Sequence, residues 1–211
     1  MRRFGKMNWL LTAGLVTVAA IHAAMAWALT GAVTASLLAR QVTLSREYMQ
    51  GIVEAGNGGL TLFAEPAPSQ ALTGFAKIIE ALPGVARANI YSADHFIRYS
   101  TEANLIGLKF TGNAELAESF NGGMSAKLEE ISATPKPEHL GLNTFEGKPF
   151  IEAYVPLTDA EGKTFAVVEL YAEAGALLAE VSHVRTIIIV AELLAGLALL
   201  AIFYGLFRRR P

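Results

Sequence analysis

The chain has 211 residues, and its 17 Lys and Arg residues nearly balance 19 Asp and Glu residues, for a net charge of −2. Cysteine is absent, which excludes a disulfide framework and any zinc or iron–sulfur site built on thiolates. Six of the basic residues lie at the two ends, so residues 39–185 carry a net charge of about −7. Such an acidic region is a poor partner for nucleic acid.

Two apolar segments near the ends predict membrane-spanning helices. Residues 9–38 contain no Asp, Glu, Lys or Arg, and residues 186–207 contain one acidic residue. A helix needs about 20 apolar residues to cross a bilayer, which both segments supply. Basic residues flank their outer ends, so residues 1–8 and 208–211 are predicted to be cytoplasmic. Residues 39–185 would then form one domain outside the membrane.

The first apolar segment allows a second interpretation. Ala24-Met25-Ala26 follows a basic start and an apolar stretch, as in a cleavable signal peptide. Because the apolar stretch continues to Leu38, we expect an uncleaved anchor.

The region between the two segments has the pattern of an α+β domain. Helical periodicity continues through residues 39–55, where an apolar stripe either forms a coiled coil or packs on the domain itself. The stripe consists of Leu38, Val42, Ser45, Met49 and Ile52. The later elements are predicted in this order: a helix from Ser69 to Leu82, strands over 88–92 and 96–101, a helix over 114–120, strands over 125–133, 150–158 and 164–172, and a helix from residue 174 onward. The five strands are expected to form one antiparallel sheet.

Three stretches of the sequence form a recognisable pattern. They are LPGVARANIYSADHFIRYSTEANLIGLKF at 82–110, NAELAESFNGG at 113–123 and PFIEAYVPLTDAEGKTFAVVELY at 149–171. Together they resemble the extracytoplasmic PAS-like, single-Cache sensor domains of bacterial histidine kinases, diguanylate cyclases and chemoreceptors, over roughly residues 40–180. The resemblance implies a PAS-like five-stranded antiparallel sheet with a long N-terminal helix, flanked by two transmembrane helices.

The same resemblance implies a two-pass protein of the bacterial inner membrane that senses a small molecule or a protein partner in the periplasm. Members of this group normally continue into a HAMP linker, a kinase or a cyclase, whereas Arg208 is followed here by only three residues. We therefore expect the signal to pass in trans to a separate membrane protein, through a homodimer or hetero-oligomer of transmembrane helices. The alternatives are a non-catalytic scaffold of a membrane complex and a sensor truncated from its output domain.

Catalytic motifs are missing from the sequence. It contains no G-x-S-x-G, H-E-x-x-H or G-x-G-x-x-G pattern. Asp94-His95 falls in a predicted turn and Glu138-His139 in a Pro-flanked loop, where these residue types are expected without any chemistry. We expect no enzyme, no metal and no cofactor.

The last two predicted strands carry the main candidate ligand site. Glu152 and Tyr154 share one face of their strand, and Glu169 and Tyr171 share one face of the next. If Thr158 pairs with Lys163, residue numbers in opposed pairs sum to 321. Glu152 then faces Glu169, Tyr154 faces Val167 and Phe150 faces Tyr171, and a two-residue shift would keep the same face.

Two carboxylates with two tyrosines suit an amine or a cation, whereas Arg98 with Tyr99 and Ser100 suits a carboxylate. The simpler alternative is that both glutamates are solvated, or bridged by Lys127 or Arg98. The candidate ligand-binding residues are Tyr91, Arg98, Tyr99, Glu152, Tyr154, Glu169 and Tyr171.

The apolar segments contain two ionisable residues, His22 and Glu192. Each lies 16 residues from a basic anchor, so both are about 24 Å from the cytoplasmic side. Since polar residues in lipid usually face a partner, they are predicted to face each other within or between subunits. The alternative places Glu192 at the outer interface and His22 against backbone groups.

Small residues in the first apolar segment recur at every fourth position, a spacing that allows close helix packing. This predicted packing ridge consists of Ala20, Ala24, Ala28, Ala32 and Ser36.

Overall fold

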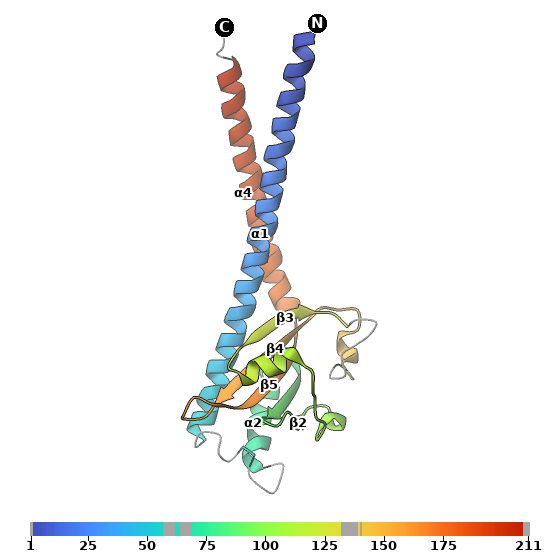
Figure 1. Cartoon of the computed structure of the whole chain (residues 1–211), viewed down its shortest axis with the longest axis vertical. Helices are drawn as coiled ribbons and strands as arrows, with labels where there is room; N and C mark the ends of the chain where they lie inside the picture. Colours follow the sequence, from blue (N-terminus) through green and yellow to red (C-terminus); the bar gives the residue numbers. More distant parts are fainter. Residues whose placement is uncertain (1, 57–61, 64–68, 132–138, 140, 209–211) are drawn as a thin grey trace. The chain divides into compact units, whose positions relative to one another are not determined.

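The computed structural model describes residues 2–56, 62–63, 69–131, 139 and 141–208 (Figure 1). The chain divides into two compact units, which are described separately. One contains residues 1–36 and 176–211, and the other contains residues 37–175.

The first unit is helical. It consists of most of α4 (Gly175–Arg208) and the N-terminal part of α1 (Arg2–Ala55) (Figure 1). Both helices contain stretches that are long and apolar enough to cross a membrane, Thr12–Ala55 and Gly175–Ile202, with mean hydropathies of 1.6 and 2.2. Their large apolar side chains, such as Trp27 and Leu193, are exposed, as a lipid environment permits.

The second unit is an α+β domain built on one antiparallel sheet. Its helices are α2 (Gln70–Glu80) and α3 (Ala114–Phe120), with the 3₁₀ turns η1 (Ala103–Leu105) and η3 (Asn143–Phe145). Its strands are β1 (Val85–Ser92), β2 (Ile97–Ser100), β3 (Ser125–Glu129), β4 (Phe150–Thr158) and β5 (Thr164–Glu173), in the order β2-β1-β5-β4-β3. The predicted PAS-like five-stranded sheet with a long N-terminal helix is confirmed.

Most predicted elements lie close to the observed ones. Helix α2 begins where Ser69 caps it, because the Ser69 hydroxyl accepts a hydrogen bond from the Leu72 N–H. Strand β1 begins three residues earlier than predicted, at Val85, and the strand predicted over 125–133 ends at Glu129. The last residues of that predicted strand, from 132 onward, lie outside the described residues.

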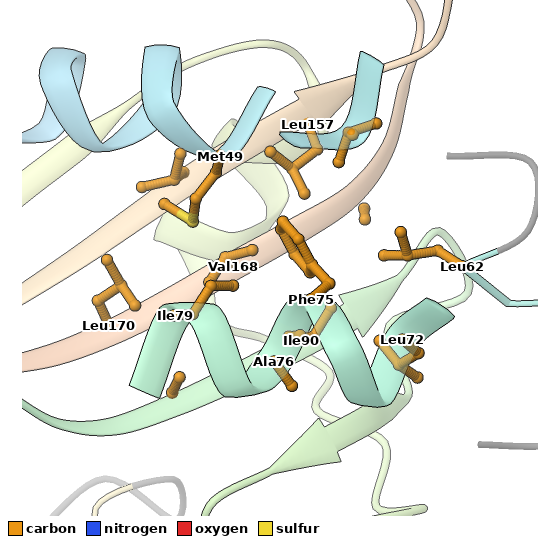
Figure 2. Packing of buried hydrophobic residues seen from close by; sticks show 14 of the residues in the cluster. Met49, Leu62, Leu72, Phe75, Ala76, Ile79, Ile90, Leu157, Val168 and Leu170 are labelled. Carbon is orange, nitrogen blue, oxygen red and sulfur yellow. The ribbon is translucent and has the colours of Figure 1, made fainter. Parts of the chain in front are cut away.

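One face of the sheet packs on α2 and on the C-terminal part of α1. Figure 2 shows Met49 of α1 and Phe75 and Ile79 of α2 pointing toward Ile90 and Val168 of the sheet. Met49 and Ile79 are completely buried, and Val42 belongs to the same core. The apolar stripe of α1 therefore packs on its own domain, which was one of the two predicted uses.

The predicted register of β4 and β5 was wrong by two residues. Residue numbers in opposed pairs sum to 323, so Glu152 pairs with Tyr171 and Tyr154 with Glu169. Thr158 pairs with Thr164 rather than with Lys163, because the turn extends to Lys163. The register shifts by one residue at a bulge between Leu157 and Thr158. Asp159 holds this turn by accepting a hydrogen bond from the Lys163 N–H at 2.8 Å. The shift is an even number, so each side chain keeps its predicted face.

Candidate functional site

The sheet face opposite the α1–α2 core carries buried polar side chains. They come from β1, β4, β5, the N-cap of α3 and the loop before η3. We call them the polar cluster: Asn89, Tyr91, Asn113, His139, Glu152, Tyr154, Glu169 and Tyr171. The two glutamates are only 2% and 0% exposed, so the prediction that they are solvated is wrong.

Glu169 is the centre of the polar cluster. Its Oε1 accepts hydrogen bonds from the hydroxyls of Tyr154, at 2.5 Å, and Tyr171, at 2.7 Å. Its Oε2 accepts from Asn89 Nδ2, at 2.6 Å, and from the Tyr91 hydroxyl, at 2.8 Å. Four donors fill the four lone-pair positions of a carboxylate. The protein thus surrounds this one group with three phenols and an amide.

The orientation of the Asn89 amide is fixed from its other side. The Ser100 Oγ accepts a hydrogen bond from the Glu102 N–H, so its own proton is directed to Asn89 Oδ1, 2.6 Å away. The amide nitrogen of Asn89 is left to face Glu169. Strand β2 therefore supports the polar cluster indirectly, through Ser100.

Tyr154 connects the two glutamates with α3. Its hydroxyl lies 2.5 Å from Glu169 Oε1 and 3.3 Å from Glu152 Oε1. The same oxygen accepts a hydrogen bond of 2.8 Å from Asn113 Nδ2. Asn113 is also the N-cap of α3, since its Oδ1 accepts from the Leu116 N–H at 2.8 Å. Tyr154 thereby joins both glutamates to the start of a helix.

Glu152 has a histidine neighbour. His139 Nε2 lies 3.2 Å from Glu152 Oε1, and both side chains are almost fully buried. The imidazole packs edge-on against Phe150 and Tyr171. Its Nδ1 has no hydrogen-bond partner among the described residues. Lys127, one of the two cations predicted as a bridge, is the cross-strand neighbour of Glu152, and its Nζ contacts Glu115 at 2.7 Å.

Arg87 of β1 is a buried cation beside the polar cluster. Its guanidinium lies over the Tyr171 ring, 5.8 Å from the centroid, and 3.9 Å from the Glu102 carboxylate. Gly141 covers this pair with a φ of +80°, and a Cβ there would lie 2.9 Å from both Arg87 and Glu102. Glycine is therefore favoured at this position by its backbone conformation, and a Cβ would also displace the ends of these two side chains.

Burial controls the electrostatics of the polar cluster. It raises the pKa of the Glu169 carboxyl, and the nearby Glu152 raises it further, while the hydrogen bonds from Tyr154 and Asn89 oppose the shift. Burial beside Glu169 also raises the pKa of the Tyr154 and Tyr171 hydroxyls well above the usual range. Burial lowers the pKa of Arg87. Both tyrosines therefore remain protonated donors at any physiological pH.

Short segments and apolar side chains cover the polar cluster. Leu105 of η1 and Leu116 of α3 form one apolar group with Tyr91 and Tyr154. Leu142 and Phe145 of the η3 segment form a second group with Phe150 and Tyr171. The cover is thus built from a seven-residue helix and two 3₁₀ turns rather than from a long rigid element.

The structure brings five of the seven candidate ligand-binding residues together and separates two. Arg98 lies on the surface, where it contacts Asp94 at 3.2 Å and the Ser92 hydroxyl at 2.8 Å. Tyr99 faces the α2 side of the sheet and donates a hydrogen bond to Glu80, which raises its pKa to about 12. A bulge at this point of the β1–β2 pairing places Ile97 and Tyr99 on opposite faces.

Asp94-His95 forms a turn, as predicted, with His95 at a φ of +65° and stacked on Phe120. A hydrogen bond from Ser92 lowers the pKa of Asp94. Glu138 lies outside the described residues, whereas His139 belongs to the polar cluster. Among the described residues, no three His, Asp or Glu side chains are grouped as metal ligands.

The sequence interpretation missed Arg87, Asn89 and Asn113 as parts of the site. Asn89 lies two residues from Tyr91 on the same strand face, a signal that could have found it. Asn113 directly precedes the helix predicted over 114–120, a position that indicates a helix cap and nothing more. Nothing in the local sequence distinguishes Arg87 from a surface arginine, because its burial depends on residue 141.

The helical unit has its own polar pair. His22 Nδ1 contacts Glu192 Oε2 between α1 and α4, within one chain. The pair lies in the wall of an apolar groove of about 980 Å³ between the two helices. Of the predicted packing ridge, Ala20, Ala24, Ala28 and Ala32 are exposed, and their contact with another helix stays a prediction.

No protein-family model matches the chain, and no curated protein matches it. Two similar solved structures are the Escherichia coli DcuS sensor domain and the extracellular domain of rpHK1S-Z16, a protein described as a histidine kinase. DcuS is 16% identical over 72% of this chain and 96% of that chain, with a TM-score of 0.41. The second is 15% identical over 73% of this chain and 56% of that chain, also with a TM-score of 0.41.

By their descriptions, one neighbour is a sensor domain and the other an extracellular domain. The fold itself is defined by the sheet order and by the helices that flank the sheet.

Proposed function

We propose that the chain is a two-pass protein of the bacterial inner membrane, with cytoplasmic termini and a periplasmic PAS-like sensor domain whose stimulus acts at the polar cluster. The observation that supports this proposal is the burial of Glu152 and Glu169 beneath three short elements, α3, η1 and η3. Two buried carboxylates cost several kcal/mol of desolvation, and apolar residues of similar volume would stabilise a sheet at least as well. Function explains their presence better than stability does.

The cover supports a role in binding rather than catalysis. Elements as short as η1, η3 and α3 open at low free-energy cost compared with a core strand. The polar cluster offers carboxylates and aromatic faces, which suit an amine or a cation once the cover opens. A stimulus favours one state of the domain only by its difference in affinity for the two states.

The output step is proposed to use the two apolar helices. His22 and Glu192 are polar groups in otherwise apolar surroundings, where such contacts hold helices in specific arrangements. We propose that the helices pass the change to a separate membrane protein, in a homodimer or hetero-oligomer that uses the packing ridge of α1.

The test is a thermal-shift screen of the full chain in lipid nanodiscs against amino acids, amines, carboxylates and divalent cations. A ligand at 100 times its Kd should stabilise the domain by about 2.7 kcal/mol. We expect Glu152→Gln to abolish the shift and Tyr99→Phe, on the opposite sheet face, to retain it. A ligand shift that both variants retain would place the stimulus elsewhere and contradict the proposal.

A second candidate function is that of a scaffold subunit in a membrane complex. It is favoured by the complete hydrogen bonding of Glu169 without any ligand, and by the His22–Glu192 contact. A partner that copurifies with the full chain and is lost on Glu192→Ala, in the absence of any ligand shift, would favour this function.

A further inference from the structure

The groove between α1 and α4 contains the polar pair of the helical unit. His22 Nδ1 contacts Glu192 Oε2, and 19% of the His22 side chain and 14% of the Glu192 side chain stay exposed. Apolar side chains such as Leu193 and Leu197 line the groove beside the pair. In a bilayer, the exposed parts of the pair face lipid tails or a partner rather than water.

Each residue of the pair has one further polar atom. Within the described part of the chain, His22 Nε2 and Glu192 Oε1 form no hydrogen bond. Gly196 of α4 lies beside the imidazole, where a Cβ would be 4.0 Å from Nε2. Because Gly196 has no side chain, Nε2 is left uncovered on this side. Polar atoms without a partner are costly in lipid, so the groove favours an occupant that supplies polar groups.

The number of protons on the pair defines what these two atoms offer to an occupant. A net charge in lipid is costly, so the pair is expected to be neutral overall. An imidazolium with a carboxylate and an imidazole with a carboxylic acid both hold two exchangeable protons. One of them lies in the contact between Nδ1 and Oε2, and the other lies on Nε2 or on Oε1. In every neutral form, the pair therefore presents one donor and one acceptor.

A second copy of the chain supplies the complementary groups. Two copies inserted in the same orientation are related by a two-fold axis along the membrane normal, which places their polar pairs at the same depth. The donor of one pair then meets the acceptor of the other, and symmetry repeats this bond. A ring of four side chains, two from each copy, satisfies the polar atoms of both pairs.

The lining of the groove fits a contact between two pairs of helices. On α4, lining residues recur every three or four positions: Arg185, Ile189, Glu192, Gly196 and Leu200. On α1, the same spacing connects Leu15, Ala19, His22, Ala26, Thr30 and Thr34. This spacing places residues on one face of a helix, and four such faces form the core of a four-helix bundle.

We infer that this groove is the contact surface for a second copy of the chain, held by reciprocal hydrogen bonds between His22 of one copy and Glu192 of the other. The inference rests on the proposed function, because it names the partner of the apolar helices. Ala20 and Ala24 of the packing ridge lie outside the groove lining, which leaves them for a separate membrane protein.

The first measurement is energy transfer between labelled copies of the full chain in lipid vesicles, followed as the protein-to-lipid ratio changes. The chain has no cysteine, so Glu161→Cys in the exposed β4–β5 turn provides a single labelling site. We expect His22→Ala to weaken dimerisation by at least about sevenfold, because two hydrogen bonds between membrane helices are lost. Ile21→Ala, at an exposed position outside the groove lining, should retain the native dimerisation.

Mixing two variants separates a bond between copies from a bond within one copy. His22→Ala and Glu192→Ala each break the pair inside the chain, yet a mixed dimer combines Glu192 of one copy with His22 of the other. We expect mixed dimers to be about threefold more stable than the statistical mixture of the two variants predicts, because one bond is regained. Dimerisation that is unchanged in His22→Ala, or mixed dimers at the statistical value, would overturn the inference.

Filling the groove is an independent test. Gly196→Leu leaves both residues of the pair in place, occupies the space beside Nε2 and has a higher helix propensity than glycine. It should weaken dimerisation at least as much as His22→Ala does. The matched control Gly14→Leu should not, since Gly14 has open space around its Cβ position and lies outside the groove lining. Native dimerisation of Gly196→Leu would also contradict the inference.

The outcomes distinguish this inference from the proposed function. A chain that stays monomeric at every protein-to-lipid ratio, but shows the ligand shift that depends on Glu152, would remove the second copy and keep the sensor. Dimerisation with the expected variant effects, but without any ligand shift, would support the groove contact and contradict the polar cluster as the site of the stimulus.

Discussion

The substitution Tyr154→Phe tests whether the polar cluster is as tightly bonded as its distances indicate. It removes one oxygen that donates to Glu169 and accepts from Asn113. The ring is 1% exposed, so phenylalanine fills the same space and water does not replace the lost hydroxyl. Glu169 stays buried with three donors in place of four.

The magnitude follows from the type of bond that is lost. A hydrogen bond to a charged group contributes about 1.5–3 kcal/mol, and a buried acceptor that loses its donor adds a desolvation cost. We expect the domain to lose about 2 kcal/mol of unfolding free energy. For a domain of this size, between the small and large classes, that lowers Tm by roughly 6–10 °C.

The assay is thermal unfolding of the full chain in nanodiscs, followed by near-ultraviolet circular dichroism. Tyr99→Phe is the control, since it makes the same chemical change at a hydroxyl that contacts the exposed Glu80. Its cost should stay within about 0.5 kcal/mol, as for most surface changes. If Tyr154→Phe costs no more than Tyr99→Phe, the polar cluster is not the bonded unit described here.

Three further predictions concern the rest of the domain. Because burial raises the pKa of Glu169, its contribution to stability is complete below the unfolded pKa and is lost as pH rises through the folded value, so Tm should fall as the pH is raised above the unfolded pKa of a glutamate, and less so in Glu152→Gln. Asn113→Ala removes the N-cap of α3 and should cost about 1 kcal/mol of unfolding free energy, whereas an equal Tm in the two proteins would show that the cap is dispensable. Phe75→Ala opens a cavity in the α1–α2 core and should cost about 3–5 kcal/mol in the same assay, and a cost below about 1 kcal/mol would contradict the packing in Figure 2.

The elements of the fold were predictable because their signals are local. Strands β4 and β5 are rich in apolar, aromatic and β-branched residues and are joined by an Asp- and Gly-containing turn, and α3 begins at an asparagine cap and ends before a Gly-Gly pair. The register of β4 and β5 was not predictable, because it depends on a bulge and on a turn that extends to Lys163. The sheet face predicted for each side chain of β4 and β5 was nevertheless correct, because the register was wrong by two residues, an even number.

The closure of the site was not predictable, because it depends on contacts between distant parts of the chain. Glu152 and Glu169 were recognised as neighbours, but whether they face water or a cover depends on α3, η1 and η3. The 3₁₀ turns are three residues each, too short to give a periodic signal. His139 was interpreted as a loop histidine because its contact with Glu152 joins a loop to a strand.

The two faces of the sheet differ in the chemistry of their contacts. The apolar face packs on α2 and on the C-terminal part of α1, where Gln50 also exchanges two hydrogen bonds with the backbone of Thr158. The polar face holds its cover through Tyr154 and Asn113. Strands β4 and β5 contribute to both faces, so a rearrangement around Glu169 acts on strands that are bonded to α1. The N-terminal part of that same helix contains the first apolar segment, so α1 is the element through which a change at the polar cluster would act under the proposed function.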